Sequence, residues 1–348
     1  MTTAHKLIDL QAQLEQERRL VSFDSYDLSV RQLLDMFESG DIFVPPEYQR
    51  QFIWEADRQS VLIESVYLGI PVPSLFMATN PDSTWEVVDG VQRLGTLSHF
   101  VGGQALLAKI ARKDVLTIKS LEKLDSMNGL TFSSLPKSLQ LHFMTRPVRV
   151  TVLNDKSDLS IRFDLFERLN TGGVLLTAQE IRNCVYRGRF NEDVKELAQY
   201  PAFRNSIKIK EAQNKASSYE EMVLRFFAYL DNYGSFAHSV KGFLNDYMSV
   251  HQNERITREK IELFKTVFDT LRAALPDGIV RSRSTTPANL YEAVAVGTAL
   301  AIKNGTTIDP SKVLPLLSDS LIKRFTGAGS NQKKYVIGRI ERARDLLS

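Results

Sequence analysis

A group of residues whose types could do chemistry follows the short, mostly apolar run 85–88 and comprises Asp89, Gly90, Gln92 and Arg93. The pattern predicts a strand that ends at Asp89 and a helix that begins directly after Gly90. The free amides of a helix's first turn attract anions, and a glycine there lets a phosphate approach the backbone closely. Gln92 and Arg93 add an amide and a guanidinium that suit phosphate oxygens. The segment therefore indicates phosphate binding.

Asp89 is the carboxylate of this group. It could orient an attacking water, hold Mg²⁺, or cap the following helix, which is the commonest role of Asp just before a helix. The residues alone leave these three roles open.

A second candidate segment is the stretch 43–54, in which two consecutive prolines favour an extended backbone. Side chains alternate along an extended chain, so Tyr48 and Arg50 are expected on one face and Gln49 on the other. These three residues could contact a ligand. The alternative is an aromatic core with one arginine on the surface.

A third candidate segment lies between two expected helices and consists of Asn170, Thr171, Gly172 and Gly173. A loop with two glycines has free amides that can surround an anion. The same residues are also typical of an ordinary helix C-terminus.

The elements that must position these groups divide the chain near residue 190. Before it, short β-branched runs alternate with helical patterns, which predicts an α+β domain over 1–190 with helices at 30–39, 56–68, 91–101 and 158–169 and strands at 74–79, 85–89 and 147–153. After it, helical periodicity dominates, which predicts an all-helical domain over 191–348. Reciprocal capping boxes are expected at Ser29 with Gln32, Thr177 with Glu180, and Ser218 with Glu221.

The composition is that of an ordinary globular protein: 43% of the 348 residues are hydrophobic and 24% are charged, which excludes disordered and collagen-like classes. The single cysteine, Cys184, excludes internal disulfides and cysteine-rich zinc sites and indicates a reducing compartment. No apolar run suits a signal peptide or a membrane span. We therefore expect a cytoplasmic protein without a membrane partner.

Basic residues concentrate at the C-terminus, where the last 28 residues hold seven Lys or Arg and two acidic residues. The periodicity predicts a helix with one buried apolar face and with Arg339 and Arg342 pointing outward. This cluster could contact DNA phosphates, or it could simply be the solvated end of a helix. The candidate nucleic-acid residues are Lys333, Lys334, Arg339 and Arg342.

Taken together, the three segments resemble the N-terminal domain of the GmrSD-type restriction endonucleases, which has a ParB/sulfiredoxin-like fold. The resemblance covers about residues 20–235 and is carried by Pro46-Glu47-Tyr48-Gln49-Arg50, by Asp89-Gly90-Val91-Gln92-Arg93-Leu94, by Phe166 followed by Asn170-Thr171-Gly172-Gly173, and by Glu180-Ile181-Arg182-Asn183. The order and spacing of these motifs agree with the family.

The resemblance implies a nucleoside triphosphate, bound with Mg²⁺ and hydrolysed, in bacterial defence against phage or foreign DNA. It places Asp89, Gln92 and Arg93 in the catalytic group. It assigns nucleotide binding to Tyr48, Gln49, Arg50, Gly90, Asn170, Thr171, Gly172 and Gly173.

Two departures from the family pattern qualify this expectation. Val91 replaces the first Gln of the D-G-Q-Q-R motif, and the chain shows no HNH-type nuclease sequence, because its five histidines are scattered. We therefore expect hydrolysis to gate a partner nuclease or another defence protein. The alternative is a regulatory module that binds a nucleotide or DNA without turnover.

Overall fold

The computed structural model describes residues 9–15, 22–45, 52, 54–154, 159–169, 176–210, 215–237, 239–281, 285–327, 329 and 331–348. The chain forms two compact units, Met1–Leu175 and Leu176–Ser348. This division lies earlier than the boundary predicted at residue 190, because the helix that follows Thr177 packs against helices of the second unit. None of the described helices is both long and apolar enough to cross a bilayer.

The first unit contains a mixed five-stranded sheet in the order β1-β5-β3-β4-β2. Pairs β1–β5 and β3–β4 are antiparallel, whereas β3–β5 and β2–β4 are parallel. The strands are β1 (Phe23–Ser29), β2 (Ile42–Phe43), β3 (Leu75–Thr79), β4 (Trp85–Asp89) and β5 (Pro147–Leu153). Strand β4 therefore lies between β3 and β2, inside the sheet.

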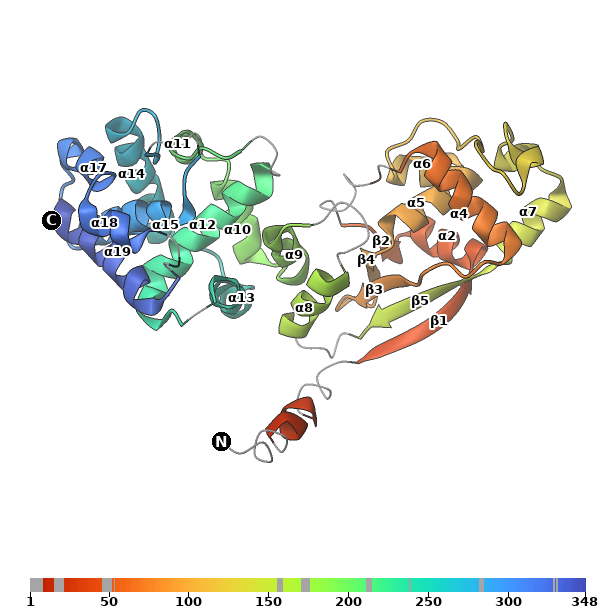
Figure 1. Cartoon of the computed structure of the whole chain (residues 1–348), viewed down its shortest axis with the longest axis horizontal. Coiled ribbons are helices and arrows are strands. Elements are labelled where there is room, and N and C mark those ends of the chain that lie inside the picture. The colour runs from red at the N-terminus through yellow and green to blue at the C-terminus, as the bar shows by residue number, and fades with distance from the viewer. Residues whose placement is uncertain are drawn as a thin grey trace. The chain divides into compact units, whose positions relative to one another are not determined.

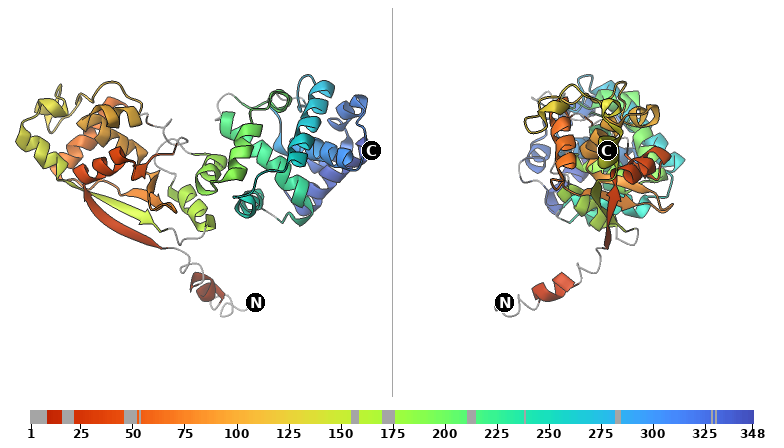
Figure 2. Two further views of the ribbon diagram at one scale, coloured as in Figure 1. Left: turned by 180° about the vertical axis from the view of Figure 1, so that it is seen from behind. Right: turned by 90° about the vertical axis from the view of Figure 1, so that its right-hand side faces the viewer.

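Helices α2, α4 and α5 lie together above the sheet in the view of Figure 1, and Figure 2 shows the same layer from behind. The helices of this unit are α2 (Val30–Ser39), α4 (Ala56–Leu68), α5 (Val91–Val101), α6 (Gln104–Lys109), α7 (Lys137–Met144) and α8 (Leu159–Leu169), with 3₁₀ turns η1 (Asp125–Met127) and η2 (Phe132–Ser134). Their apolar faces and the central strands form the core of the unit.

Helix α2 illustrates how the sequence determines these elements. The Ser29 side chain accepts a hydrogen bond from Gln32 N, and the helix ends at Gly40, whose φ of 96° is left-handed. Its buried residues are Val30, Leu33, Leu34 and Phe37, the spacing of one helical face. This face packs against the sheet.

The second unit is helical. Its elements are α9 (Ala178–Val185), α10 (Arg189–Leu197), α11 (Pro201–Ser206), α12 (Lys215–Asn232), η3 (Tyr233–Ser235), α13 (Val240–His251), α14 (Arg258–Ala274), α15 (Ala288–Tyr291), the π-helical η4 (Glu292–Val296), α16 (Gly297–Lys303), α17 (Pro310–Leu316), α18 (Ser320–Phe325) and α19 (Lys333–Leu347). Aromatic rings fill its centre: Phe226, Phe264 and Phe268 have ring centroids 4.6–5.7 Å apart. The predicted α+β unit followed by a helical unit is therefore confirmed.

The capping predictions have mixed outcomes. Thr177 and Glu180 form the reciprocal capping box at the start of α9. Ser218 is not a cap, because α12 already begins at Lys215, and Glu221 instead binds arginines inside the second unit. A Ser-x-x-Glu spacing can thus occur within a helix, where the Glu is used for another contact.

Candidate functional site

The turn from β4 into α5 has the geometry that the sequence predicts. Gly90 has φ 104° and ψ 12°, a left-handed conformation that an L-residue adopts only with strain. A Cβ at Gly90 would lie 2.3 Å from Leu75 Cδ2 on the neighbouring strand. Both constraints explain why a glycine stands between the strand and the helix.

Asp89 does not cap the helix. Gly90 is the N-cap residue, and no side chain makes a cap hydrogen bond at this end of α5. The Asp89 carboxylate instead accepts a hydrogen bond from Arg93 Nη2 at 2.7 Å. The same Nη2 also donates to the Ser74 carbonyl oxygen at 3.0 Å. Asp89 and Ser74 thus fix the direction of the Arg93 guanidinium.

Gln92 positions the second candidate segment. Its Oε1 accepts a hydrogen bond from Trp54 N at 3.1 Å, and Gln59 Nε2 donates to the Trp54 carbonyl oxygen at 2.6 Å. Close by, Gly95 makes room for an aromatic ring, because a Cβ there would lie 2.5 Å from Phe52 Cδ2. The structure therefore brings the end of the 43–54 segment onto α5.

His99, two turns beyond Gln92, belongs to the same polar network. Its Nδ1 lies 2.8 Å from Gln59 Oε1, and its Nε2 lies 2.9 Å from the Asp114 carbonyl oxygen. Burial lowers the pKa of His99. These contacts link α4 and α5 and give His99 a positioning role.

A cavity of about 450 Å³ opens beside Arg93. Its polar lining comprises Ser74, Arg93, Arg146, Arg149 and Asp27. The Nε atoms of Arg93 and Arg146 are both buried and have no hydrogen-bond partner. The arginines give this cavity a positively charged lining that suits an anionic group.

Arg146 and Arg149 were not identified from the sequence. Arg146 Nη2 donates to the Tyr67 carbonyl oxygen at 2.9 Å, and its guanidinium lies 3.6 Å from where a Cβ on Gly69 would be. Arg149 makes two hydrogen bonds to Asp27, at 2.9 and 2.8 Å, which lower the pKa of the Asp27 carboxyl. The available signal was the pair of arginines at the start of the strand 147–153.

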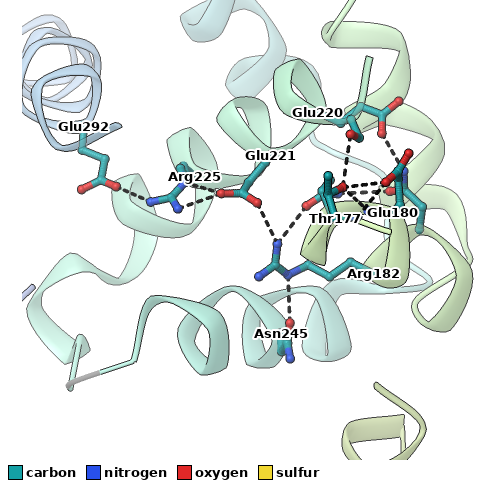
Figure 3. Close-up of polar contacts among 11 residues, drawn as sticks. Thr177, Glu180, Arg182, Glu220, Glu221, Arg225, Asn245 and Glu292 are labelled. Atoms are coloured by element: carbon teal, nitrogen blue, oxygen red, sulfur yellow. Dashed lines mark hydrogen bonds and ion pairs between the residues drawn. The ribbon is translucent and has the colours of Figure 1, made fainter. Parts of the chain in front are cut away.

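Several predicted ligand-binding residues are not among those that the structure describes. Tyr48, Gln49 and Arg50 lie outside the described residues, as do Asn170, Thr171, Gly172 and Gly173. The motif at 180–183 is described and is buried within the second unit: its polar residues are 2–5% exposed. Figure 3 shows Glu180 and Arg182 among the polar contacts of that unit. The motif therefore contributes to the core of the second unit.

The prediction that Arg339 points outward from the C-terminal helix is wrong. Arg339 is 0% exposed and pairs with Glu292, which is also 0% exposed. Arg342 is 36% exposed and pairs with Asp319 at 2.9 Å. Lys334 lies over the Tyr335 ring, 5.0 Å from its centroid, and Lys333 is exposed. Arg339 is buried because it falls on the same face of the helix as Val336, Ile340 and Ala343.

Within the described ranges, no group of three or more His, Cys, Asp or Glu side chains could hold a metal ion. Asp89 is the carboxylate nearest to Arg93, at 2.7 Å. A metal at this place would therefore need phosphate oxygens or waters among its ligands, as Mg²⁺ in phosphate sites generally has.

Residues 30–187 match the family described as GmrSD restriction endonuclease, N-terminal domain. A solved structure, the C2221 form of a Pnob8-like ParB-N domain, is similar at 10% identity and a TM-score of 0.22, covering 94% of this chain and 99% of that one. No curated protein matches the chain. Residues 30–187 are thus similar to the N-terminal domains of GmrSD restriction endonucleases.

Proposed function

We propose that the chain is a component of a restriction or anti-phage defence system and that its first unit binds and hydrolyses a nucleoside triphosphate. The family match supports the defence role, since it names a restriction endonuclease domain. The cavity beside Arg93 supports the ligand, since a volume of about 450 Å³ suits a small phosphorylated molecule.

One observation carries the nucleotide proposal. Arg93 and Arg146 come from different elements, yet both line the cavity and both have a buried, unpaired Nε. A phosphate oxygen is an acceptor that suits a guanidinium, and an anion in this cavity would be attracted by the positive charge of both arginines. The residues present therefore fit the phosphates of a nucleotide.

Asp89 holds Arg93 in place before any ligand binds, so little side-chain entropy is lost on binding. When a triphosphate is bound, Mg²⁺ would supply charge neutralisation of the phosphate oxygens. Asp89 is 29% exposed, so its carboxylate remains accessible to a metal ion or a water molecule. We assign the positioning of that metal or water to Asp89.

A second function, binding without turnover, is favoured by the contacts of the same residues. Gln92 Oε1 already accepts from Trp54 N, and an Asp89 oxygen already accepts from Arg93. Val91 replaces the other amide of the family motif. In this alternative the first unit binds a nucleotide without hydrolysing it, and nucleotide binding regulates a partner protein.

Release of inorganic phosphate from each of the four nucleoside triphosphates, with Mg²⁺, separates the two functions. The proposal predicts release from at least one of them by the wild-type protein and none by Asp89→Asn. Binding without release would establish the sensor alternative. Absence of both binding and release, at millimolar nucleotide, would contradict both functions.

The proposal includes a partner protein. Because no HNH-type motif occurs in the chain, we propose that a separate nuclease or another defence protein is gated by the nucleotide state. Co-purification of the chain with the product of a neighbouring gene, with and without nucleotide, tests this step. Association that does not change with the nucleotide would contradict gating.

A further inference from the structure

The second unit has a cavity of its own, about 410 Å³ in volume, which the nucleotide proposal does not use. Its lining is mostly polar and includes two lysines, Lys208 and Lys210. The remaining polar side chains include several hydroxyls and the pair Glu221 and Arg225. A cavity of this size lies within the range of small-molecule sites.

Lys208 is held in place by backbone hydrogen bonds to Thr286. Lys208 N donates to Thr286 Oγ1 at 2.9 Å, and Thr286 N donates to the Lys208 carbonyl oxygen at 2.9 Å. Both lysines line the cavity, together with Ile209 between them. Neither forms an ion pair with any described residue. Their two charges are therefore available to a ligand.

Hydroxyl groups also line the cavity. Ser218 and Thr285 face the cavity, and within the described part of the chain their hydroxyls have no hydrogen-bond partner. A hydroxyl can donate to an anionic oxygen at little steric cost. Two ammonium groups with nearby hydroxyls form a donor set suited to a phosphate.

Glu221 is the acidic residue of the lining, and its negative charge is neutralised by arginines, so it does not repel an anion. Glu221 Oε1 accepts two hydrogen bonds from Arg225, at 2.9 and 2.7 Å, and its Oε2 accepts from Arg182 at 3.2 Å. Burial would raise the pKa of Glu221, but the two arginines together lower it, so the carboxylate stays ionised and neutralised. The lining therefore keeps an excess of positive charge.

Glu221 also connects the cavity to the interior of the unit. Figure 3 shows the chain of contacts from Arg182 through Glu221 and Arg225 to Glu292, with Asn245 accepting from Arg182. These residues come from helices α9, α12 and α13 and from the π-helical segment η4. A π-helical turn within a longer helix often marks a functional position. Glu292 continues the chain to Arg339 in α19.

We propose that this cavity binds the phosphate group of a small ligand of about mononucleotide size, with Lys208 and Lys210 as its main cationic contacts. Ser218 and Thr285 donate hydrogen bonds to the phosphate oxygens. The site is separate from the nucleotide site of the first unit and does not depend on that proposal. Its ligand can be a free phosphorylated molecule or a phosphate of a nucleic-acid backbone.

Calorimetry of the full chain with three probes tests this site: inorganic phosphate, adenosine monophosphate, and a short single-stranded DNA without terminal phosphates. The variant is Lys208→Ala with Lys210→Ala. The matched control is Lys303→Ala with Lys312→Ala, which removes two exposed lysines of the same unit that do not line the cavity. None of these lysine side chains forms a hydrogen bond or an ion pair with a described residue, so both double variants should keep the circular dichroism of the wild type.

We expect the cavity variant to bind at least one probe tenfold or more weakly, whereas the control variant binds like the wild type. Arg93→Ala, measured in parallel, reports any binding of the same probes by the first unit. Binding of the monophosphate alone would identify a free ligand, and binding of DNA alone would identify a backbone phosphate. Equal affinity in the cavity variant and in the control would overturn the proposal. So would the absence of binding by all three probes, or loss of binding only in Arg93→Ala.

Discussion

Arg93 Nη2 donates to Asp89 Oδ2 at 2.7 Å across the glycine turn that joins strand β4 to helix α5. The two residues are four apart, but only Arg93 lies in the helix. The ion pair is therefore not an ordinary surface pair along one helix, since it connects the end of a strand to the first turn of a helix. It orients a guanidinium toward the cavity while its Nε remains without a partner.

Gly90→Ala should destabilise the first unit strongly. The left-handed φ costs about 1–2 kcal/mol for an L-residue, and the overlap with Leu75 adds about 1–3 kcal/mol. The control is Gly40→Ala, where φ is also positive but nothing lies within 4 Å of the new Cβ, so only the first cost applies. Both tryptophans lie in the first unit, so urea unfolding followed by tryptophan fluorescence measures it. Equal losses of stability would contradict the close approach to Leu75.

Asp89→Asn should leave the first unit folded, because Asp89 makes no cap hydrogen bond. An amide oxygen can still accept from Arg93, so nucleotide binding should stay within about threefold of the wild type, while turnover is lost. Tryptophan fluorescence, calorimetry and phosphate release measure these three properties. Unfolding of this variant would show that the carboxylate acts in stability and would remove its assigned role in hydrolysis.

Arg339 and Arg342 lie on one helix and should respond differently to substitution. Arg339→Met leaves the buried Glu292 with one arginine partner fewer and should cost about 3 kcal/mol or more. Arg342→Ala removes a solvent-screened pair and should cost much less. Far-UV circular dichroism during urea unfolding follows this unit, which contains no tryptophan. Similar costs for the two variants would contradict the buried position of Arg339.

Acidification should weaken the pair of Asp319 with Arg342. Arg342 lowers the pKa of Asp319, chiefly through its hydrogen bond, so the folded protein binds that proton less readily than the unfolded chain. The contribution is present above the unfolded value of about 3.9 and is lost as the pH falls through the lowered pKa. Arg342→Ala should therefore show a smaller loss of stability than the wild type between about pH 4 and pH 2. Parallel profiles for the two proteins would contradict the linkage.

Local patterns predicted the elements around the site well. The helices at 30–39, 56–68 and 91–101 and the strands at 85–89 and 147–153 begin and end where the sequence indicated. These segments combine clear periodicity with a glycine, a proline or a cap at their ends. Strand β1 was missed, because most of its residues are exposed and only Leu28 is buried, so its sequence carries little apolar alternation.

Contacts between distant residues could not be predicted. Arg146 lies 53 positions after Arg93, and only the folded sheet brings both to one cavity. Arg339 was expected at the surface because arginine is rarely buried, yet Glu292, 47 residues earlier, provides its buried partner. Periodicity shows which face of a helix is apolar. It does not show which carboxylate will meet a cation on that face.

Calorimetry of nucleoside triphosphate binding with Mg²⁺, using Arg93→Ala, Arg146→Ala and Arg31→Ala, tests the central claim most directly. Arg31 is an exposed arginine of the first unit that does not line the cavity, so its variant controls for the loss of one positive charge. The account predicts that Arg93→Ala and Arg146→Ala each weaken binding tenfold or more, while Arg31→Ala binds like the wild type. Wild-type affinity in both cavity variants, with tryptophan fluorescence showing a folded first unit, would contradict it.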